Sequence, residues 1–312
     1  MEIVEVTSGE YQAGMTHPYH VFASAVFNDL NAHKCEHVHY LLFKDKKVRL
    51  GIIGGVKDGS FYAPFSAPFG GFIFSKNDIK LQLIDEAITL LMQWLKEKGL
   101  RSIQMTLPPF IYGESFIAKL TNSFYRNKFT IEKTDLNYAF NLHNFDAHYA
   151  TNIWRNARKN LGIALNNKLA FKPCKTMEEK ELAYGIIVKN REERGFPLRM
   201  TWQQIKETLV IIKADFFLVY NDVQEAIASA MVFHINPKIV QVVYWGDLPE
   251  YSHLKTMNFL SYKIFEFYKD TNIEIVDIGP STENSVPNAG LCEFKESIGC
   301  DISTKLTFSK QI

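Results

Sequence analysis

The 312-residue sequence lacks the long apolar runs of membrane-spanning proteins. The segment closest to a membrane helix is AITLLMQWL at 87–95. It is interrupted by polar residues and falls short of the roughly 18 apolar residues that such a helix needs. The first residues, MEIVEVTSGE, have neither the basic part nor the apolar part of a signal peptide. We therefore expect a cytoplasmic protein with no membrane insertion.

Cysteine is scarce and scattered, at Cys35, Cys174, Cys292 and Cys300. The absence of a C-x-x-C spacing favours reduced thiols over a disulfide framework or a zinc site. The close histidine pairs His17/His20 and His37/His39 have no carboxylate or thiol at ligand spacing, so we expect no metal.

An excess of either charge is also missing, with 35 Lys and Arg against 34 Asp and Glu. No net field draws this protein toward nucleic acid or an acidic membrane, so any contact with a polyanion must use a local patch. A hydrophobic content of 46% is enough for one large core or two modest ones, and the length favours about two lobes.

Period-two alternation and helical stripes predict an α/β (α+β) chain of two lobes. In the first lobe, 1–145, we expect strands at 2–6, 35–43, 47–56, 101–107 and 129–141. Helices are expected within 17–33, up to about 98, and at 115–123, with a loop at 63–72. In the second lobe, 146–312, we expect strands at 169–173, 216–220, 225–235, 239–246, 273–278 and 302–308. Helices are expected around 154–159, at 177–194, 202–213 and 256–268, and up to 296 after a polar loop.

Six phrases are more specific than this pattern: SAPFGGF at 66–72, LPPFIY at 107–112, NREERGFPLRMT at 190–201, YWGD at 244–247, DIGPST at 277–282 and GLCEFKESIG at 290–299. Together they resemble the Fem-type peptidoglycan-bridge aminoacyltransferases and the smaller BioF-associated and polysaccharide-linked GNAT relatives. The similarity spans nearly the whole chain, and D-x-G followed by G-L-x-x-F-K is its most specific part. It implies two GNAT-like lobes, each a mixed, mainly antiparallel sheet flanked by helices, with the donor site in the second.

The resemblance implies an N-acyl or aminoacyl transferase. Such an enzyme moves an acyl group from a thioester or aminoacyl ester onto an amine of a small-molecule or nucleotide-linked acceptor, such as an amino sugar or a cell-envelope precursor. No tightly bound cofactor is expected, and acyl-CoA or aminoacyl-tRNA is the possible co-substrate. Coenzyme A users of this fold commonly carry glycines before the donor-site helix, and the segment at 247–259 has none. The alternative is a non-catalytic module that binds a glycan, a nucleotide sugar or a protein partner.

In a GNAT-type site, two strands splay apart and a backbone N–H freed by a bulge polarises the donor carbonyl. By the resemblance, these strands are 239–246 and 273–278. The expected catalytic residues lie at or near their ends: Lys295, Tyr244, Asp247 and Asp277. Lys295 would stabilise negative charge, Tyr244 would protonate the leaving group, and Asp247 would orient the amine or take its proton.

Further residues are candidates for binding the donor or the acceptor: Phe294, Trp245, Gly279, Ser281, Arg155, Arg158, Phe69, Gly70, Tyr112 and Arg194. Each has an ordinary structural alternative. The aromatic residues and Phe294 suit a core, and Lys295 and the Arg155–Arg158 ridge suit a solvated helix face. Ser281 suits an exposed loop and Arg194 an internal ion pair.

Overall fold

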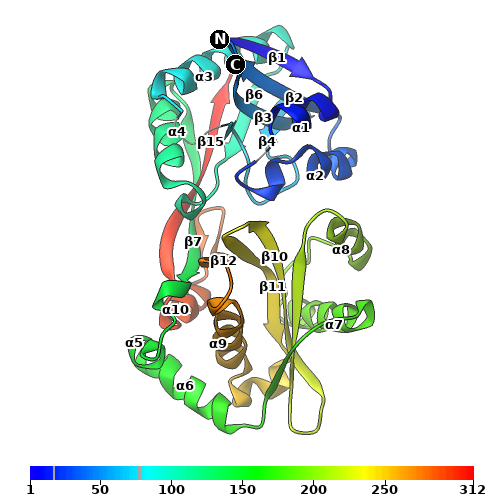
Figure 1. Cartoon of the computed structure of the whole chain (residues 1–312), viewed down its shortest axis with the longest axis vertical. Helices are drawn as coiled ribbons and strands as arrows, with labels where there is room; N and C mark the ends of the chain where they lie inside the picture. The colour runs from blue at the N-terminus through cyan, green and yellow to red at the C-terminus, as the bar shows by residue number, and fades with distance from the viewer. Residues whose placement is uncertain (17, 76–78) are drawn as a thin grey trace. The chain divides into compact units, whose positions relative to one another are not determined.

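The computed structural model describes residues 1–16, 18–75 and 79–312 and divides into two compact units. Unit 1 comprises Met1–Leu136, Thr282–Val286 and Ser303–Ile312, and unit 2 comprises Asn137–Ser281 and Pro287–Ile302. The first change of unit lies near the boundary expected after 145, and the C-terminal residues return to unit 1. Figure 1 shows both units, with labels on many of their helices and strands.

Unit 1 contains strands that follow one another in space in the order β1 (Glu2–Val6), β2 (His37–Lys44), β3 (Val48–Lys57), β4 (Ser60–Ala63), β6 (Ser102–Thr106), β15 (Asp301–Gln311) and β7 (Thr130–Asn141), with β5 (Ile73–Phe74) on β3. Strand β4 runs parallel to β6, whereas β1, β2 and β3 pair antiparallel. The helices are α1 (Ser8–Gly14), α2 (Ala25–Leu30), α3 (Leu81–Glu97) and α4 (Glu114–Arg126). The predicted stripe of α3 is buried: Ile84, Ala87, Ile88, Leu91 and Leu95.

In unit 1, one helix was missed and one predicted helix is divided. Helix α1 was not predicted, although Thr7 and Glu10 form a capping box at its start. The helix expected within 17–33 is divided, because Ser24 has an extended backbone between a short 3-10 helix (Val21–Ala23) and α2, which it caps. His17 lies outside the described residues.

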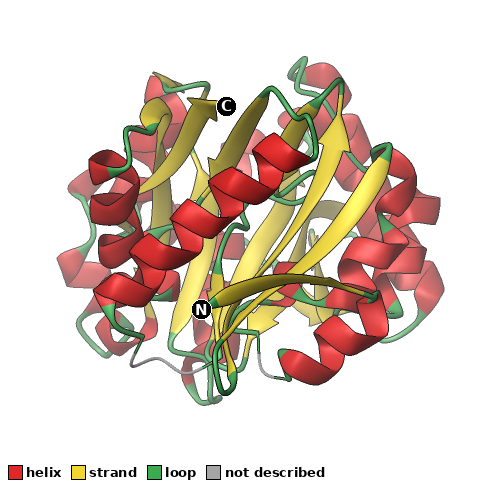
Figure 2. Ribbon diagram, turned by 90° about the horizontal axis from the view of Figure 1, so that it is seen from above, coloured by secondary structure: helices red, strands yellow, loops and turns green. Residues whose placement is uncertain are grey.

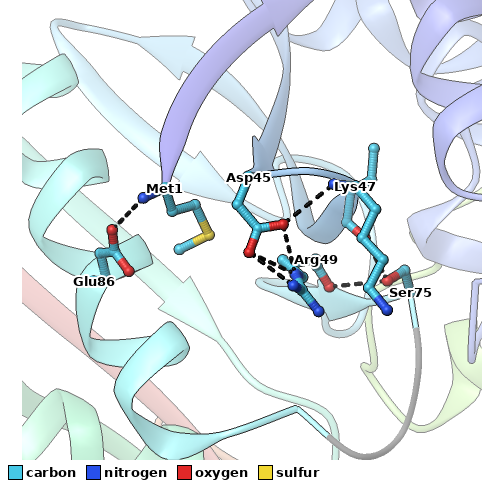
Figure 3. A network of polar contacts seen from close by, with 7 residues as sticks. Met1, Asp45, Lys47, Arg49, Ser75 and Glu86 are labelled. Atoms are coloured by element: carbon cyan, nitrogen blue, oxygen red, sulfur yellow. Dashed lines mark hydrogen bonds and ion pairs between the residues drawn. The ribbon is translucent and has the colours of Figure 1, made fainter.

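A network of polar contacts surrounds the turn between β2 and β3 in unit 1 (Figure 3). The Arg49 guanidinium donates to both oxygens of Asp45, and the Ser75 hydroxyl donates to the Val48 carbonyl at 2.7 Å. Lys47, Arg49 and Lys80 line a hollow of about 380 Å³ here. No residue of the expected site borders it.

Unit 2 has the spatial strand order β7, β12 (Ile275–Pro280), β11 (Ile239–Asp247), β10 (Ala226–Asn236), β9 (Ala214–Tyr220) and β8 (Ala170–Pro173). Only β11 and β12 pair in parallel among these neighbours. The helices are α5 (Tyr149–Asn152), α6 (Arg155–Asn166), α7 (Met177–Glu193), α8 (Trp202–Leu209), α9 (Thr256–Lys269) and α10 (Ala289–Ser297). Figure 2 shows helices lying against the strands, which confirms the predicted mixed α/β class.

The polar loop expected after the β12 region contains a small hairpin, β13 (Thr282–Glu283) and β14 (Val286–Pro287). Its turn residues Asn284 and Ser285 have positive φ angles of 50° and 67°, which the sequence pattern did not indicate. In the described part of the chain, the four cysteines are free thiols and no helix has the length and apolarity to cross a bilayer.

Candidate functional site

Strands β11 and β12 of unit 2 separate partway along their length. Their register runs through Ile239 opposite Ile275, then Val240 opposite Val276, and ends at Gln241 opposite Asp277. Strand β11 continues to Asp247 and β12 to Pro280 with no further pairing between them. The predicted splaying of these strands is therefore confirmed, and we call this divergence the β11–β12 fork.

Strand β11 carries a bulge just beyond the fork. Met231 of β10 lies opposite Tyr244, whereas the next residue, Val232, lies opposite Val242. Val243 is therefore the extra residue on β11. A bulge of this kind interrupts the ladder and turns backbone groups away from regular pairing, which is the feature that a GNAT-type donor site requires.

A buried carboxylate joins three elements at the fork. Asp277 accepts hydrogen bonds from Gln241 Nε2 on β11 at 2.7 Å and from Asn137 Nδ2 on β7 at 2.8 Å. It also accepts from the backbone N–H of Gly279 at 2.8 Å. The Asp277, Asn137 and Gln241 side chains are all buried, so we call them the fork clamp.

Strand β12 is itself irregular beside β7. Asp277 lies opposite Ala139 and Gly279 lies opposite Tyr138, which leaves Ile278 as an extra residue. Gly279 has a φ of 73°, a conformation that strongly favours glycine. A Cβ there would meet no atom within 4 Å, so the glycine is needed for its backbone angle rather than for space. The strand runs over Ile275–Pro280, so it starts and ends two residues later than the predicted strand at 273–278.

Lys295 on α10 is buried and bound to the end of β12. Its Nζ donates to the carbonyls of Ile278, Gly279 and Pro280 at 3.0, 2.9 and 3.1 Å. An ammonium has three protons, so these bonds use all of its donors. Burial lowers the pKa of Lys295 to about 8, which leaves it mostly charged at neutral pH. The interpretation of Lys295 as a solvated helix residue was wrong, because α10 packs it against β12.

The neighbouring aromatic residues lie beside this lysine. Phe294 is partly buried, and its ring is 6.0 Å from that of Trp245 on β11, edge to face. Phe294 is therefore not a fully buried core residue. The two rings come from α10 and from β11 beyond the fork.

Tyr244 is held by the chain that follows α7. Its hydroxyl accepts from the backbone N–H of Arg199 at 3.3 Å, and burial raises the pKa of the phenol. The Arg191 guanidinium lies over the Tyr244 ring, with Cζ 5.5 Å from the centroid. Tyr244 is therefore a neutral phenol with a fixed orientation.

Asp247 ends β11 and is also buried. Its carboxylate accepts from the Thr256 hydroxyl at 2.6 Å and forms an ion pair with Arg194 at 3.4 Å. Its carbonyl accepts from Asn190 Nδ2 at 2.7 Å. Thr256 is the first residue of α9, so Asp247 places a negative charge at the positive end of that helix. Arg194 has the ion-pairing role that the sequence left as an alternative.

The remaining expected residues lie elsewhere. Arg155 and Arg158 lie on the exposed surface of α6. In unit 1, Phe69 and Tyr112 are buried with ring centroids 4.6 Å apart, and the Gly70 N–H donates to the Thr106 carbonyl.

Ser281 was expected in an exposed loop, and this was wrong. The side chain is buried, because the backbone after β12 folds back and the Ser281 carbonyl accepts the N–H of Asn288. Its hydroxyl has no hydrogen-bond partner within the described chain.

Sequence reasoning missed Asn137, Gln241 and Val243. The first two contact Asp277 across large sequence separations, and no local pattern reports such contacts. Arg191 lies in the phrase at 190–201, whose charged residues could shape the acceptor cleft or form internal ion pairs. Its partial burial and its contact with Tyr244 were not predicted.

No family model and no curated protein sequence matches the chain, whereas solved structures do. The structure of FemX superposes with a TM-score of 0.72 at 11% identity over 100% of this chain and 98% of that one. The C-terminal domain of a putative lysylphosphatidylglycerol synthetase from Agrobacterium fabrum gives 0.60 at 11% identity over 97% and 92%. A tandem GNAT protein from the clavulanic acid biosynthesis pathway gives 0.57 at 10% identity over 99% and 98%. At these identities the likeness shows the fold alone, and that fold is the Fem-like, GNAT-type acyltransferase fold.

Proposed function

We propose that unit 2 contains the active site of an N-acyl or aminoacyl transferase. The observation that carries this proposal is the β11–β12 fork with the Val243 bulge on one side and Lys295 at the end of the other. An activated carbonyl between the strands would accept a hydrogen bond from a β11 N–H. That bond would stabilise the oxyanion formed when an amine attacks.

In the proposed reaction, the amine nitrogen attacks the carbonyl carbon, a C–N bond forms, and the C–O or C–S bond of the donor breaks. The leaving oxygen or sulfur takes a proton, which Tyr244 supplies as a neutral phenol. The attacking amine gives its proton to water, and water returns a proton to the Tyr244 phenolate. Asp247 already accepts from Thr256 and Arg194. The Asp247 carboxylate is therefore better suited to orienting the amine than to removing a proton from the amine.

The start of α9 favours an aminoacyl ester over a coenzyme A thioester as donor. Coenzyme A in this fold places its pyrophosphate at the N-terminus of the corresponding helix, where backbone N–H groups receive it. Here the buried Asp247 carboxylate lies there already, and it would repel a pyrophosphate. The exposed cations Arg155, Arg158 and Lys159 of α6 offer a local surface for the phosphates of a tRNA.

The test is a matched donor panel with purified protein. Isotope-labelled aminoacyl-tRNAs and acyl-CoAs are each offered with amino sugars and nucleotide-linked cell-envelope precursors, and amide products are identified by mass spectrometry. We expect amide formation from aminoacyl-tRNA. Tyr244→Phe is expected to slow it by about a hundredfold, the usual size of a general-acid contribution.

Saturable binding of a donor or an acceptor without any product would refute the transferase proposal and favour the non-catalytic module. Product from acyl-CoA alone would refute the choice of donor and leave the transferase standing. Trp202→Phe, at the start of α8, serves as the matched aromatic control.

A further inference from the structure

Arg191 differs from three other arginines of the described chain in having no acidic partner among the described residues. Arg49, Arg126 and Arg194 form ion pairs with Asp45, Asp85 and Asp247. The half-buried guanidinium of Arg191, in the last turn of α7, has no ion pair or hydrogen bond within the described residues, and its buried Nε is without an acceptor. A partly buried cation without a counter-charge is unfavourable.

Two aromatic rings hold this guanidinium in place. Its Cζ lies 5.5 Å from the Tyr244 ring centroid and 5.8 Å from that of Phe196. Cation–π contacts of this kind fix the orientation of an arginine without neutralising it. The charge therefore stays available beside Tyr244.

The surroundings of Arg191 add positive charge. Arg194 lies one helical turn away, and its positive charge acts on Arg191. The charge of Arg191 in turn acts on Lys295 and contributes to its lowered pKa. The nearby carboxylates are engaged, Asp247 by Thr256 and Arg194, and Asp277 by the fork clamp.

We infer that Arg191 binds an anionic oxygen group of the substrate, a carboxylate or a phosphate, beside the β11–β12 fork. A planar guanidinium with free terminal nitrogens matches two such oxygens at once, which a lysine does not. This inference rests on the proposed function in one respect, because it takes the bound anion to be part of the substrate.

The test measures anion binding without turnover. The full chain is titrated calorimetrically with inorganic phosphate and with acetate, at constant ionic strength set by chloride. We expect saturable binding of one of the two, and the preferred anion distinguishes a phosphate from a carboxylate ligand. Arg191→Met is expected to weaken this binding at least about tenfold, the worth of a charge-assisted hydrogen bond.

Lys189→Met is the matched control, because Lys189 is an exposed cation on the same helix. It should bind the anion as the wild type does, and Arg191→Lys should show an intermediate loss. Equal binding by wild type and Arg191→Met, or no saturable binding of either anion by the wild type, would overturn the inference.

Chemical labelling keeps the inference testable if Arg191→Met does not fold. Phenylglyoxal modification of wild-type Arg191, mapped by mass spectrometry, should be slowed by the preferred anion, and an unchanged rate would refute the inference. Loss of anion binding would leave the acyl-transfer proposal standing. A failed donor panel with intact anion binding would remove only that proposal.

Discussion

Gln241 and Asp277 are the last residues in register between β11 and β12, and their side chains are hydrogen-bonded to each other at 2.7 Å. The strands therefore diverge immediately beyond a buried side-chain link. Asn137 binds the same carboxylate from β7. The fork is thus fixed by the folded chain and does not depend on a ligand to open it.

Replacing Gln241 by Met should weaken unit 2. The change keeps the side-chain volume and removes one donor from the buried Asp277 carboxylate, so we expect a loss of about 1.5–3 kcal/mol in the free energy of unfolding. Urea denaturation measures it. Gln203→Met, at an exposed position of α8, should change stability by less than about 0.5 kcal/mol. Equal effects of the two changes would show that the clamp contributes nothing.

Lys295→Met should lower both stability and turnover. The substitution leaves three carbonyls at the end of β12 without their donor, at a cost of roughly 2–5 kcal/mol. Lys206→Met, on the exposed side of α8, is the stability control. Turnover by the folded fraction should fall about a hundredfold or more, because a preorganised positive charge is lost. Full turnover in that fraction would remove Lys295 from the mechanism.

The same lysine predicts a pH dependence. Burial lowers its pKa to about 8, so the ammonium loses its proton as the pH rises through that value. Turnover should therefore decline above about pH 8, and Lys295→Arg should remove this decline because arginine stays charged. A decline of equal position and size in Lys295→Arg would assign it to another group.

His20 predicts sensitivity to acid in unit 1. The ring is fully buried against Phe22 and Phe69, neither nitrogen has a partner in the described chain, and burial lowers its pKa from 6.5 to about 3. The unfolded chain takes up a proton below pH 6.5 and the folded chain does not, so stability is lost progressively as the pH falls from 6.5 toward 3.

His20→Phe should remove this loss, which amounts to roughly 3 kcal/mol at pH 4. Urea denaturation of both proteins at pH 7 and pH 4 measures it, with the exposed His33→Phe as control. Parallel losses in wild type and His20→Phe would place the acid sensitivity elsewhere.

Local patterns were sufficient for most of the fold. The meander of β9, β10 and β11 follows from period-two alternation, and the start of α9 at Thr256 from its apolar spacing. Helix α1 was missed because its seven residues bury only Tyr11, and a short stripe carries little signal. The buried position of Ser281 depends on a hairpin turn in which Asn284 and Ser285 have positive φ angles. Asparagine and serine do not require positive φ angles, so the sequence did not indicate this turn.

The candidate site was predictable only in part. The D-x-G and F-K phrases placed Asp277 and Lys295 near each other, but their partners are backbone carbonyls and distant side chains. Asn137 precedes Asp277 by 140 positions, so only the folded sheet brings them together. Whether Tyr244 and Asp247 act in chemistry stays a prediction.

The most direct test of the account is a crystal structure with a stable donor analogue, such as an acceptor-stem RNA carrying an amide-linked amino acid. We predict that its carbonyl oxygen lies between β11 and β12, within hydrogen-bond distance of a backbone N–H at the Val243 bulge, with the Gln241–Asp277 bond intact. A structure in which β11 and β12 pair through to Asp247, or in which the carbonyl binds away from the fork, would contradict the account.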